Sequence, residues 1–493
     1  MKANSKHPNG HTIVRTSIPP GTILYHGRPV PEYPERDWVA FDPEHAAIFA
    51  WGVNGTVYTF AATRDLTLLY FDGCSANKVD GVVDTQDILF WGKLLHKHTE
   101  WWGEMERLEV GCVWARQHGI DGFIRMEFDF EIIYCDFSDG LELVTVLSPV
   151  HGELPLPHPS DPRNLTSPRT WDAGSQLSPM QNHMLGAHPE GTFHGFRKAD
   201  YPPEGPDELL SSLPPIVPPP GWKGTFPLTS FEARRAGAWH NDFPGLSQVH
   251  ADASTLISFF DPSLRSLVDA RRNTTRNQYA AGNASQEDIA RVRQDVSEMA
   301  LRSPGANSGV DWVGLARTIQ ERFKDRLPYL QHLLHQPIMN ASAQAAGVRK
   351  QLIVSLIPHM RKVEIGEAQW FADIAHDCAA RFTKSLSVSR YTKQEESVHH
   401  AVEEVLHEVC RVYTGAWVDA FDVESQSTDV AAGLLEKWRG EFDALIEWLD
   451  WPAWIQCHPA CEVDEYCYVP QGKPWGIPDD HEPRCRPIVD VSF

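Results

Sequence analysis

A stretch rich in proline divides this chain into two parts with different sequence patterns. Residues 151–230 hold 16 of the 37 prolines in the 493-residue chain, most densely at 154–159 and 214–220. Proline fixes φ and has no backbone N–H, so such a segment supports little regular secondary structure. We expect residues 151–230 to be a linker or a wrapping segment, with a domain on either side.

The part before this segment, residues 1–150, has the pattern of an α+β domain with a mostly antiparallel sheet. Short runs rich in Val, Ile, Phe and Tyr lie between turn residues and predict strands. The predicted strands are 12–15, 21–26, 56–60, 66–71, 122–126 and 130–137, and residues 37–42 fit a strand that feeds a helix. Helices are predicted at 43–51, with Asp42 as N-cap, and at 102–118, ended by Gly119.

Beyond the Pro-rich segment, residues 231–455 show helical periodicity and almost no strand signal. We expect an all-helical domain of six to eight helices. The predicted helices are 262–272, 286–300, 311–334, 341–359, 370–382, 394–420 and 430–449. Residues 456–493 form a tail rich in Cys, Pro and acidic residues, too short to hold a core without a staple or a partner surface.

Charge and hydropathy exclude some classes of protein. With 44 Lys+Arg against 66 Asp+Glu, the net charge is −22. This argues against a surface that binds nucleic acid throughout, although a local basic groove remains open. No apolar run of roughly 18 residues is present, so no membrane-spanning helix is expected. The polar N-terminus shows no signal peptide, and we predict a cytoplasmic location.

The nine cysteines fall into two groups. Five are scattered singly in apolar surroundings, which predicts buried free thiols in a reducing compartment. They are Cys74, Cys112, Cys135, Cys378 and Cys410. The other four, Cys457, Cys461, Cys467 and Cys485, cluster in the tail. Their spacing leaves a metal site, local disulfides and reduced thiols all open.

The common nucleotide and hydrolase motifs are absent. The chain has no G-x-G-x-x-G, no P-loop, no G-x-S-x-G and no H-E-x-x-H. On a predicted helix, His399, Glu403 and His407 share one face, a row that could bind metal but more often is a solvated face. We therefore predict no cofactor and no metal.

Several polar residues at strand ends could carry chemistry. His26 and Arg28 leave the strand Leu24-Tyr-His-Gly-Arg28, where His could move a proton and Arg could grip a phosphate or carboxylate. Asp72 and Asp84 lie in two acid-bearing segments that we expect to be turns, able to bind a cationic group.

The predicted hairpin 122–137 places charged residues among apolar ones. Glu131 shares a strand face with Ile133, and Asp136 lies on the other face. A carboxylate on an apolar face needs a partner, and Arg125 is a candidate. A structural salt bridge and a catalytic acid are both open for Glu131.

Arginines concentrate locally in the helical part, as an RNA backbone contact requires. Helix faces also carry Arg for solubility, so both interpretations stay open. The candidate residues are Arg271, Arg272, Arg276, Arg291 and Arg293.

These segments together resemble one large group of filamentous-fungal proteins. The resemblance runs through residues 19–28, 37–42, 70–73, 84–86 and 122–137, and continues at 308–312, 408–417 and the Cys457–Cys467 region. This group is largely uncharacterised, and the resemblance extends to the fungal arginine-containing cyclodipeptide synthases that it includes. It is unlike the bacterial cyclodipeptide synthases, so their serine nucleophile is not carried over.

The resemblance implies a tRNA-dependent activity. Arginyl-tRNA and a second aminoacyl-tRNA would donate activated acyl groups, which close to a cyclo(Arg-Xaa) diketopiperazine. We predict His26 or Glu131 for proton transfer, and Asp72, Asp84 or Asp136 for the guanidinium of the substrate. Arg28 and Arg125 would help to bind substrate, and the Arg-rich helices would contact tRNA. No obligate protein partner is evident.

Two other hypotheses remain. His26 on an early strand and Glu131 on a late one faintly resemble ADP-ribosyltransferases, in which a His and a Glu contact NAD. A non-catalytic binding module is the third possibility.

Overall fold

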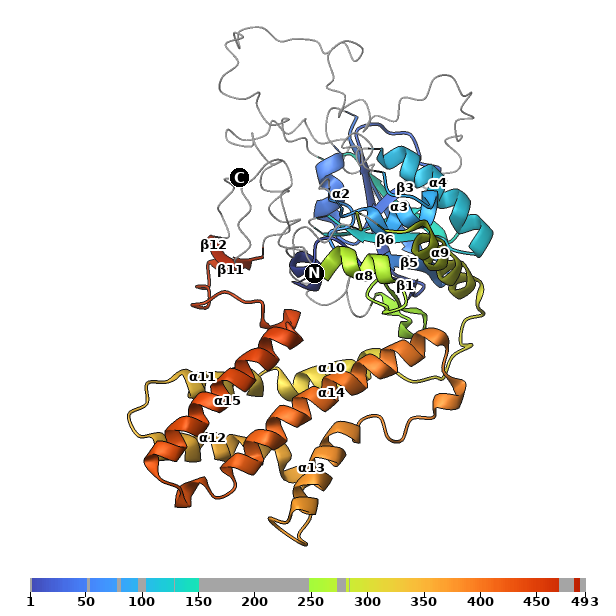
Figure 1. Cartoon of the computed structure of the whole chain (residues 1–493). Helices are drawn as coiled ribbons and strands as arrows, with labels where there is room; N and C mark the ends of the chain where they lie inside the picture. Colours follow the sequence, from blue (N-terminus) through green and yellow to red (C-terminus); the bar gives the residue numbers. More distant parts are fainter. Residues whose placement is uncertain are drawn as a thin grey trace.

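The computed structural model describes residues 2–50, 54–77, 81–95, 103–127, 129–149, 248–272, 281–282, 284–469 and 483–487. The predicted linker, 151–230, lies outside this range. Figure 1 shows two bodies, a curled sheet with helices packed on it and a bundle of helices. The predicted α+β class is confirmed. In the described part of the chain, no helix is long and apolar enough to cross a membrane.

The N-terminal body is built on one ten-stranded sheet. Its strands are β1 (Thr12–Ile18), β2 (Ile23–Arg28), β3 (Asp37–Ala40), β4 (Thr56–Ala62), β5 (Leu66–Phe71), β6 (Gly122–Met126), β7 (Phe130–Tyr134), β8 (Leu141–Leu147), β9 (His250–Ala251) and β10 (Ile257–Ser258). They lie in the order β10-β1-β5-β6-β7-β3-β2-β4-β8, with β9 also beside β1. The sequence pattern predicted most of these strands but missed β8, β9 and β10.

The sheet is antiparallel except between β5 and β6. These two strands run parallel because the chain crosses over between them through helices α3 (Asp84–Trp91) and α4 (Glu104–His118). The acid-bearing turn predicted at 84–87 is wrong, since these residues form the first turn of α3. Acidic residues in a first turn interact favourably with the helix dipole, which explains how the same residues suit a helix.

The two faces of the sheet have separate cores. The inner face of the curl buries a cluster that includes Leu24, Tyr58 and Ile132. On the other face, sheet residues such as Phe123 and Ile133 pack under α3, α4 and α9 (Gln286–Leu301). Helix α2 (Pro43–Phe49) covers a smaller patch on this second face, around Ala40. We call this second face the helix-covered face.

The chain returns to the N-terminal body after residue 247. Strands β9 and β10 pair with β1, and α8 (Arg265–Arg272) and α9 pack into the core of the helix-covered face. The expected domain boundary at 231 therefore falls about 80 residues earlier than the start of the bundle, because the apolar face of α9 completes the N-terminal core.

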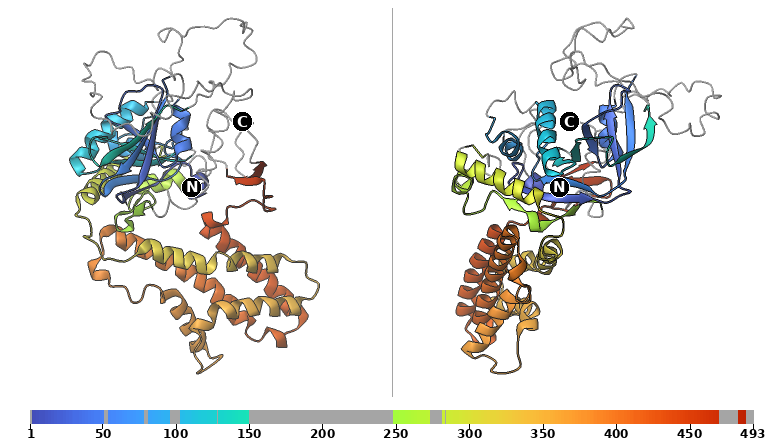
Figure 2. Two further views of the ribbon diagram at one scale, coloured as in Figure 1. Left: turned by 180° about the vertical axis from the view of Figure 1, so that it is seen from behind. Right: turned by 90° about the vertical axis from the view of Figure 1, so that its right-hand side faces the viewer.

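The C-terminal body is a helical bundle with its own core. Its helices are α10 (Trp312–Phe323), α11 (Arg326–His335), α12 (Ala341–Leu356), α13 (Ala368–Ala380), α14 (Lys393–Ala420) and α15 (Thr428–Leu449). The two views in Figure 2 show this bundle at one end of the sheet body. The single helix predicted at 311–334 is split into α10 and α11, which places Pro328 in a first turn, where a missing N–H is tolerated.

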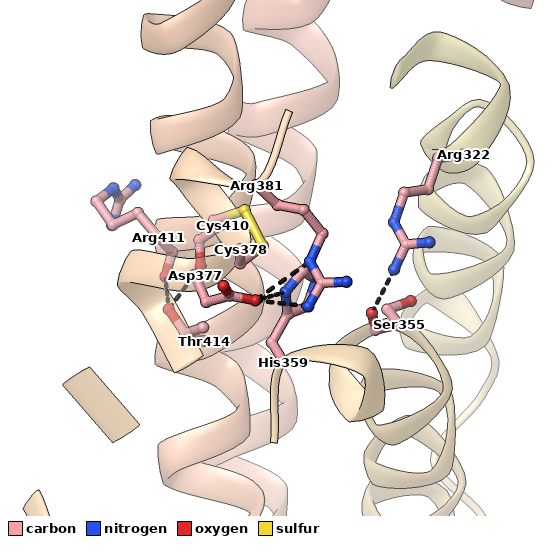
Figure 3. Close-up of a disulfide and its surroundings, with 9 residues drawn as sticks. All are labelled: Arg322, Ser355, His359, Asp377, Cys378, Arg381, Cys410, Arg411 and Thr414. Carbon is pink, nitrogen blue, oxygen red and sulfur yellow. Dashed lines mark hydrogen bonds and ion pairs between the residues drawn. A yellow bond between two sulfur atoms is a disulfide. The ribbon is translucent and has the colours of Figure 1, made fainter. Parts of the chain in front are cut away.

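The cysteine prediction is wrong for four of the five scattered residues. Cys112 and Cys135 form a disulfide between α4 and the end of β7, and Cys378–Cys410 joins α13 to α14. Figure 3 shows the second disulfide beside Asp377, which accepts hydrogen bonds from neighbouring basic side chains. Cys74 is the free cysteine, and it is buried. Pairing in space could not be read from these positions because each pair joins different elements.

The tail holds a two-stranded sheet formed by β11 (Glu465–Tyr468) and β12 (Arg484–Pro487). Disulfides Cys457–Cys467 and Cys461–Cys485 staple it. Of the three alternatives left open for these cysteines, the structure has local disulfides. At the other end of the chain, the short helix α1 (Lys2–Lys6) reaches the bundle through an ion pair between Lys6 and Asp450.

Candidate functional site

A row of paired strand residues defines the floor of the candidate site. Arg125 on β6 lies opposite Glu131 on β7, Glu131 opposite Ala40 on β3, and Ala40 opposite Tyr25 on β2. Residues paired across strands project to the same face of a sheet. Glu131 therefore belongs to the helix-covered face, with α2 on one side and α3 and α4 on the other.

Arg125 and Glu131 form a buried ion pair, as the hairpin predicted. Arg125 Nε donates to Glu131 Oε1 at 3.0 Å, and its Nη2 also contacts that oxygen. Arg125 Nη1 lies 2.7 Å from Glu104 Oε2 on α4 and 3.4 Å from Gln86 Oε1 on α3. A buried charge is tolerated only with such partners, so this network fixes the guanidinium on the floor of the site.

A second buried ion pair lies behind the first. Arg107 on α4 and Asp87 on α3 are 3.0 Å apart, and their side chains are 1% and 2% exposed. Asp87 also accepts a hydrogen bond from the backbone N–H of Leu95. This pair joins the two helices that cover Arg125.

Two carboxyl groups meet at the edge of the floor. Asp42 occupies the predicted N-cap position of α2, but its side chain makes no capping hydrogen bond. It interacts instead with Asp129, which is fully buried at the start of β7. Burial, with the hydrogen bond to Asp42 second, raises the pKa of Asp129 well above its usual range. The two carboxyl groups can therefore share one proton.

His45 on α2 adds an imidazole to the same place. Its ring stacks on Trp38 and lies near Phe49, and it is fully buried. Burial lowers the pKa of His45 to about 4, so the ring is neutral at pH 7. One ligand-type atom each of His45, Glu127 and Glu131 lies within 4.8 Å of the others.

Gly27 explains how α2 comes so close to the sheet. A Cβ on Gly27 would lie 1.7 Å from the carbonyl oxygen of Ala46, so only glycine permits this packing. The close approach brings His45 down to the strand floor. Carboxylates outnumber guanidinium groups in the resulting site, which suits a cationic ligand and a proton relay.

His26 does not belong to this site. Strand alternation places it on the opposite face from Tyr25 and hence from Glu131. Its Nδ1 lies 2.6 Å from the carbonyl oxygen of Trp38, and its ring contacts Tyr58 and Phe137. Burial lowers the pKa of His26. His26 and Glu131, which the NAD hypothesis uses together, therefore project to opposite faces of the sheet.

The other predicted substrate-binding residues are held elsewhere. Arg28 Nη1 donates to the Glu32 carbonyl, and Asp72 accepts from the backbone N–H groups of His11 and Thr12. Asp84 accepts a hydrogen bond from the backbone N–H of Ala281. Asp136 is exposed and accepts from Ser138 in a turn. Among the predicted residues with described side chains, Arg125 and Glu131 make a direct ion pair.

The predicted tRNA-binding arginines divide in two. The side chains of Arg271, Arg272 and Arg276 lie outside the described part. Arg291 donates to the carbonyl of Ser263, and Arg293 donates to the carbonyl of Leu89 at the end of α3. Arg293 thus packs α9 against α3. In the row on α14, His399 is half-buried beside Trp312 and Tyr391 and lies 3.4 Å from the exposed Glu403.

Sequence reasoning missed Glu104, Arg107, Glu127 and Asp129. Glu104 and Arg107 are three residues apart on a predicted helix, a spacing that is common on exposed surfaces. The α4 segment carries little amphipathic signal that would have marked Arg107 as buried. For Asp129, a single acid in a tight turn carries no signal of its own.

The chain is similar to fungal proteins of unassigned activity. A family described as the YPL277C N-terminal domain matches residues 52–186. The uncharacterized protein YOR389W of Saccharomyces cerevisiae is 25% identical over 537 residues, covering 95% of this chain and 78% of that protein. The uncharacterized protein YPL277C of the same yeast is 28% identical over 326 residues, covering 53% of this chain and 61% of that protein. No solved structure matches the chain.

Proposed function

We propose that the chain is a tRNA-dependent cyclodipeptide synthase that joins an arginyl group to a second aminoacyl group. The observation that carries the proposal is the buried Asp42–Asp129 pair beside His45 and Glu131. The resemblance of residues 19–28 and 122–137 to the arginine-containing synthases supplies the reaction class.

The reaction needs proton transfer and no net oxidant. The amine of one aminoacyl group attacks the ester carbonyl of the other, a C–N bond forms, and the ester C–O bond to the tRNA ribose breaks. The amine loses a proton and the departing hydroxyl gains one. A second amide bond, formed in the same way, closes the ring.

The site residues have complementary roles in this proposal. The Asp42–Asp129 pair, which can share a proton, takes it from the amine and returns it to the leaving hydroxyl. Surplus carboxylates hold the positive charge of the arginyl substrate. Glu131 positions Arg125 on the floor. His26 has no direct role, which revises the expectation for that residue.

Expression in a heterologous host tests the activity. Mass spectrometry of the medium should reveal an Arg-containing cyclodipeptide, and its mass gives the second residue. Asp42→Asn and Asp129→Asn should each lower product by about 100-fold or more, the usual contribution of proton-transfer groups. Asp136→Asn, in an exposed turn, is the matched control and should keep full activity. No product from soluble wild-type protein overturns the function, and full activity in both site variants overturns the site.

A second candidate is a tRNA-independent binding module for cationic ligands, and the four disulfides favour it. Disulfides persist in oxidising compartments and are rare in the cytosol, where aminoacyl-tRNA is made. Alkylation of thiols in the native host before lysis separates the two candidates. Reduced cysteines together with product support the synthase, and paired cysteines without product support the binding module.

A further inference from the structure

Three potential metal ligands converge on the helix-covered face from separate parts of the chain. His45 comes from α2, Glu131 from β7, and Glu127 from the turn between β6 and β7. The ligand-type atoms of the three side chains all lie within 4.8 Å of one another. We propose that His45, Glu127 and Glu131 bind a divalent transition-metal ion.

The floor of the site leaves one oxygen of Glu131 available for an ion. Both contacts from Arg125 go to Oε1 of Glu131, and the side chain is 6% exposed. Oε2 accepts no hydrogen bond from the described residues. A carboxylate that is anchored through one oxygen can bind a metal ion through the other, and its anchor then fixes the geometry of the ligand.

The ring of His45 is held in place in a similar way. Its plane stacks at 26° on Trp38, with ring centroids 5.3 Å apart, and Phe49 lies on α2 nearby. Packing of this kind limits rotation of the imidazole and keeps one of its nitrogens within 4.8 Å of a carboxylate oxygen of Glu131. Orientation by surrounding groups is typical of metal-binding histidines.

The donor set selects the class of ion. One imidazole nitrogen with two carboxylate oxygens suits Zn²⁺ or Mn²⁺ better than thiophilic ions. Ligands about 2.1 Å from a common ion lie about 3.0–3.4 Å from one another, so small rotations from the present separations complete the site. Asp42 lies close enough to influence His45 and adds a further carboxylate beside it.

Other convergent groups in the described residues do not compete for this assignment. These groups contain Cys457, Cys461, Cys467 and Cys485, whose sulfur atoms are bonded to each other in two disulfides. A thiolate is the form that binds metal, so a disulfide sulfur is a poor ligand. The His45 group contains no cysteine, so it does not depend on the redox state of the thiols.

Metal titration of the full-length chain tests the proposal. The protein is stripped with EDTA, kept free of reductant, and titrated with Zn²⁺ and with Mn²⁺ by calorimetry. We expect one high-affinity ion per chain, with native mass spectrometry giving the same stoichiometry. Glu127→Gln keeps the side-chain volume at a half-buried position and should weaken binding at least about 10-fold, since even outer-sphere partners of metal sites change affinity by this much.

Two further variants keep the test decisive. Glu131→Gln should weaken binding as well, and its melting temperature without metal shows whether the chain still folds. Glu403→Gln, beside His399 on the surface of α14, is the control for adventitious binding and should change nothing. Folded wild-type protein that binds no ion stoichiometrically, or binding that Glu127→Gln leaves unchanged, overturns the proposal. The assay uses neither tRNA nor product, so its outcome is independent of the proposed function.

Discussion

At the scale of single residues, Glu395 shows how one carboxylate can join two helices. It accepts hydrogen bonds from Trp312 Nε1 at 3.0 Å, from the backbone N–H of Ser308 and from that of Thr392, where α14 begins. Burial would raise the pKa of Glu395, but the hydrogen bonds, first that from Ser308, outweigh burial and lower it. Its contribution to stability is therefore complete above the unfolded pKa of about 4.3 and is lost as pH falls below that value.

Glu395→Gln should lower the free energy of unfolding by about 1.5–3 kcal/mol at pH 7, the usual range for hydrogen bonds to a charged group. The difference from wild type should be smaller at pH 3 than at pH 7, because the contribution of the carboxylate decreases as the pH falls below about 4.3. Urea unfolding of both proteins at the two pH values checks this. An equal difference at pH 7 and pH 3 would contradict the assigned role.

Side-chain pairs could be predicted from the sequence where the two residues lie close together along the chain. The Arg125–Glu131 pair could be predicted because a hairpin brings its two strands side by side. Asp42 could be placed at the start of α2, yet its partner Asp129 lies 87 residues away along the chain. His26 and Glu131 could not be assigned to faces, because strand alternation fixes a face only once the order of the strands is known.

At the scale of elements, replacing two different glycines by alanine should change stability in opposite directions. Gly27→Ala should push α2 off the sheet, because the new methyl group would overlap the Ala46 carbonyl. It should lower the melting temperature and disturb the site around His45. Gly347→Ala, in α12 with open space around the added Cβ, should raise stability by about 0.5–1 kcal/mol. Thermal unfolding of both variants is the measurement, and a neutral Gly27→Ala would contradict the packing of α2.

Helices were well predicted where amphipathic periodicity was strong, as in α9 and α14, and β5 was predicted from its apolar run. Strands β9 and β10 have two residues each, too few for any period to show. Helix α3 was mistaken for a turn because its first residues are those of a turn, and its remaining signal is short. The sequence could not assign α8 and α9 to the N-terminal body, because their apolar residues complete a core with segments far away along the chain.

At the scale of the whole molecule, the disulfides give a direct prediction. Purified protein, denatured without reductant and alkylated, should take up one label, on Cys74. After reduction it should take up nine, one for each cysteine in the chain. Mass spectrometry of the intact chain distinguishes the two labelling states.

Reductant should also lower the melting temperature of the protein, since closing loops of 23 and 32 residues stabilises a chain by about 3–4 kcal/mol each.

The return of the chain to β1 after residue 247 makes the N-terminal body discontinuous in sequence. A backbone cut between residues 151 and 247 would leave two fragments whose strands and core side chains still interlock. Such fragments should elute together and, made separately, should find each other on mixing. Residues 1–150 alone would instead expose the edge of β1 and the apolar surface that α9 covers. The sheet body therefore needs the segments on both sides of the cut in order to fold. The two fragments could serve as the halves of a split protein.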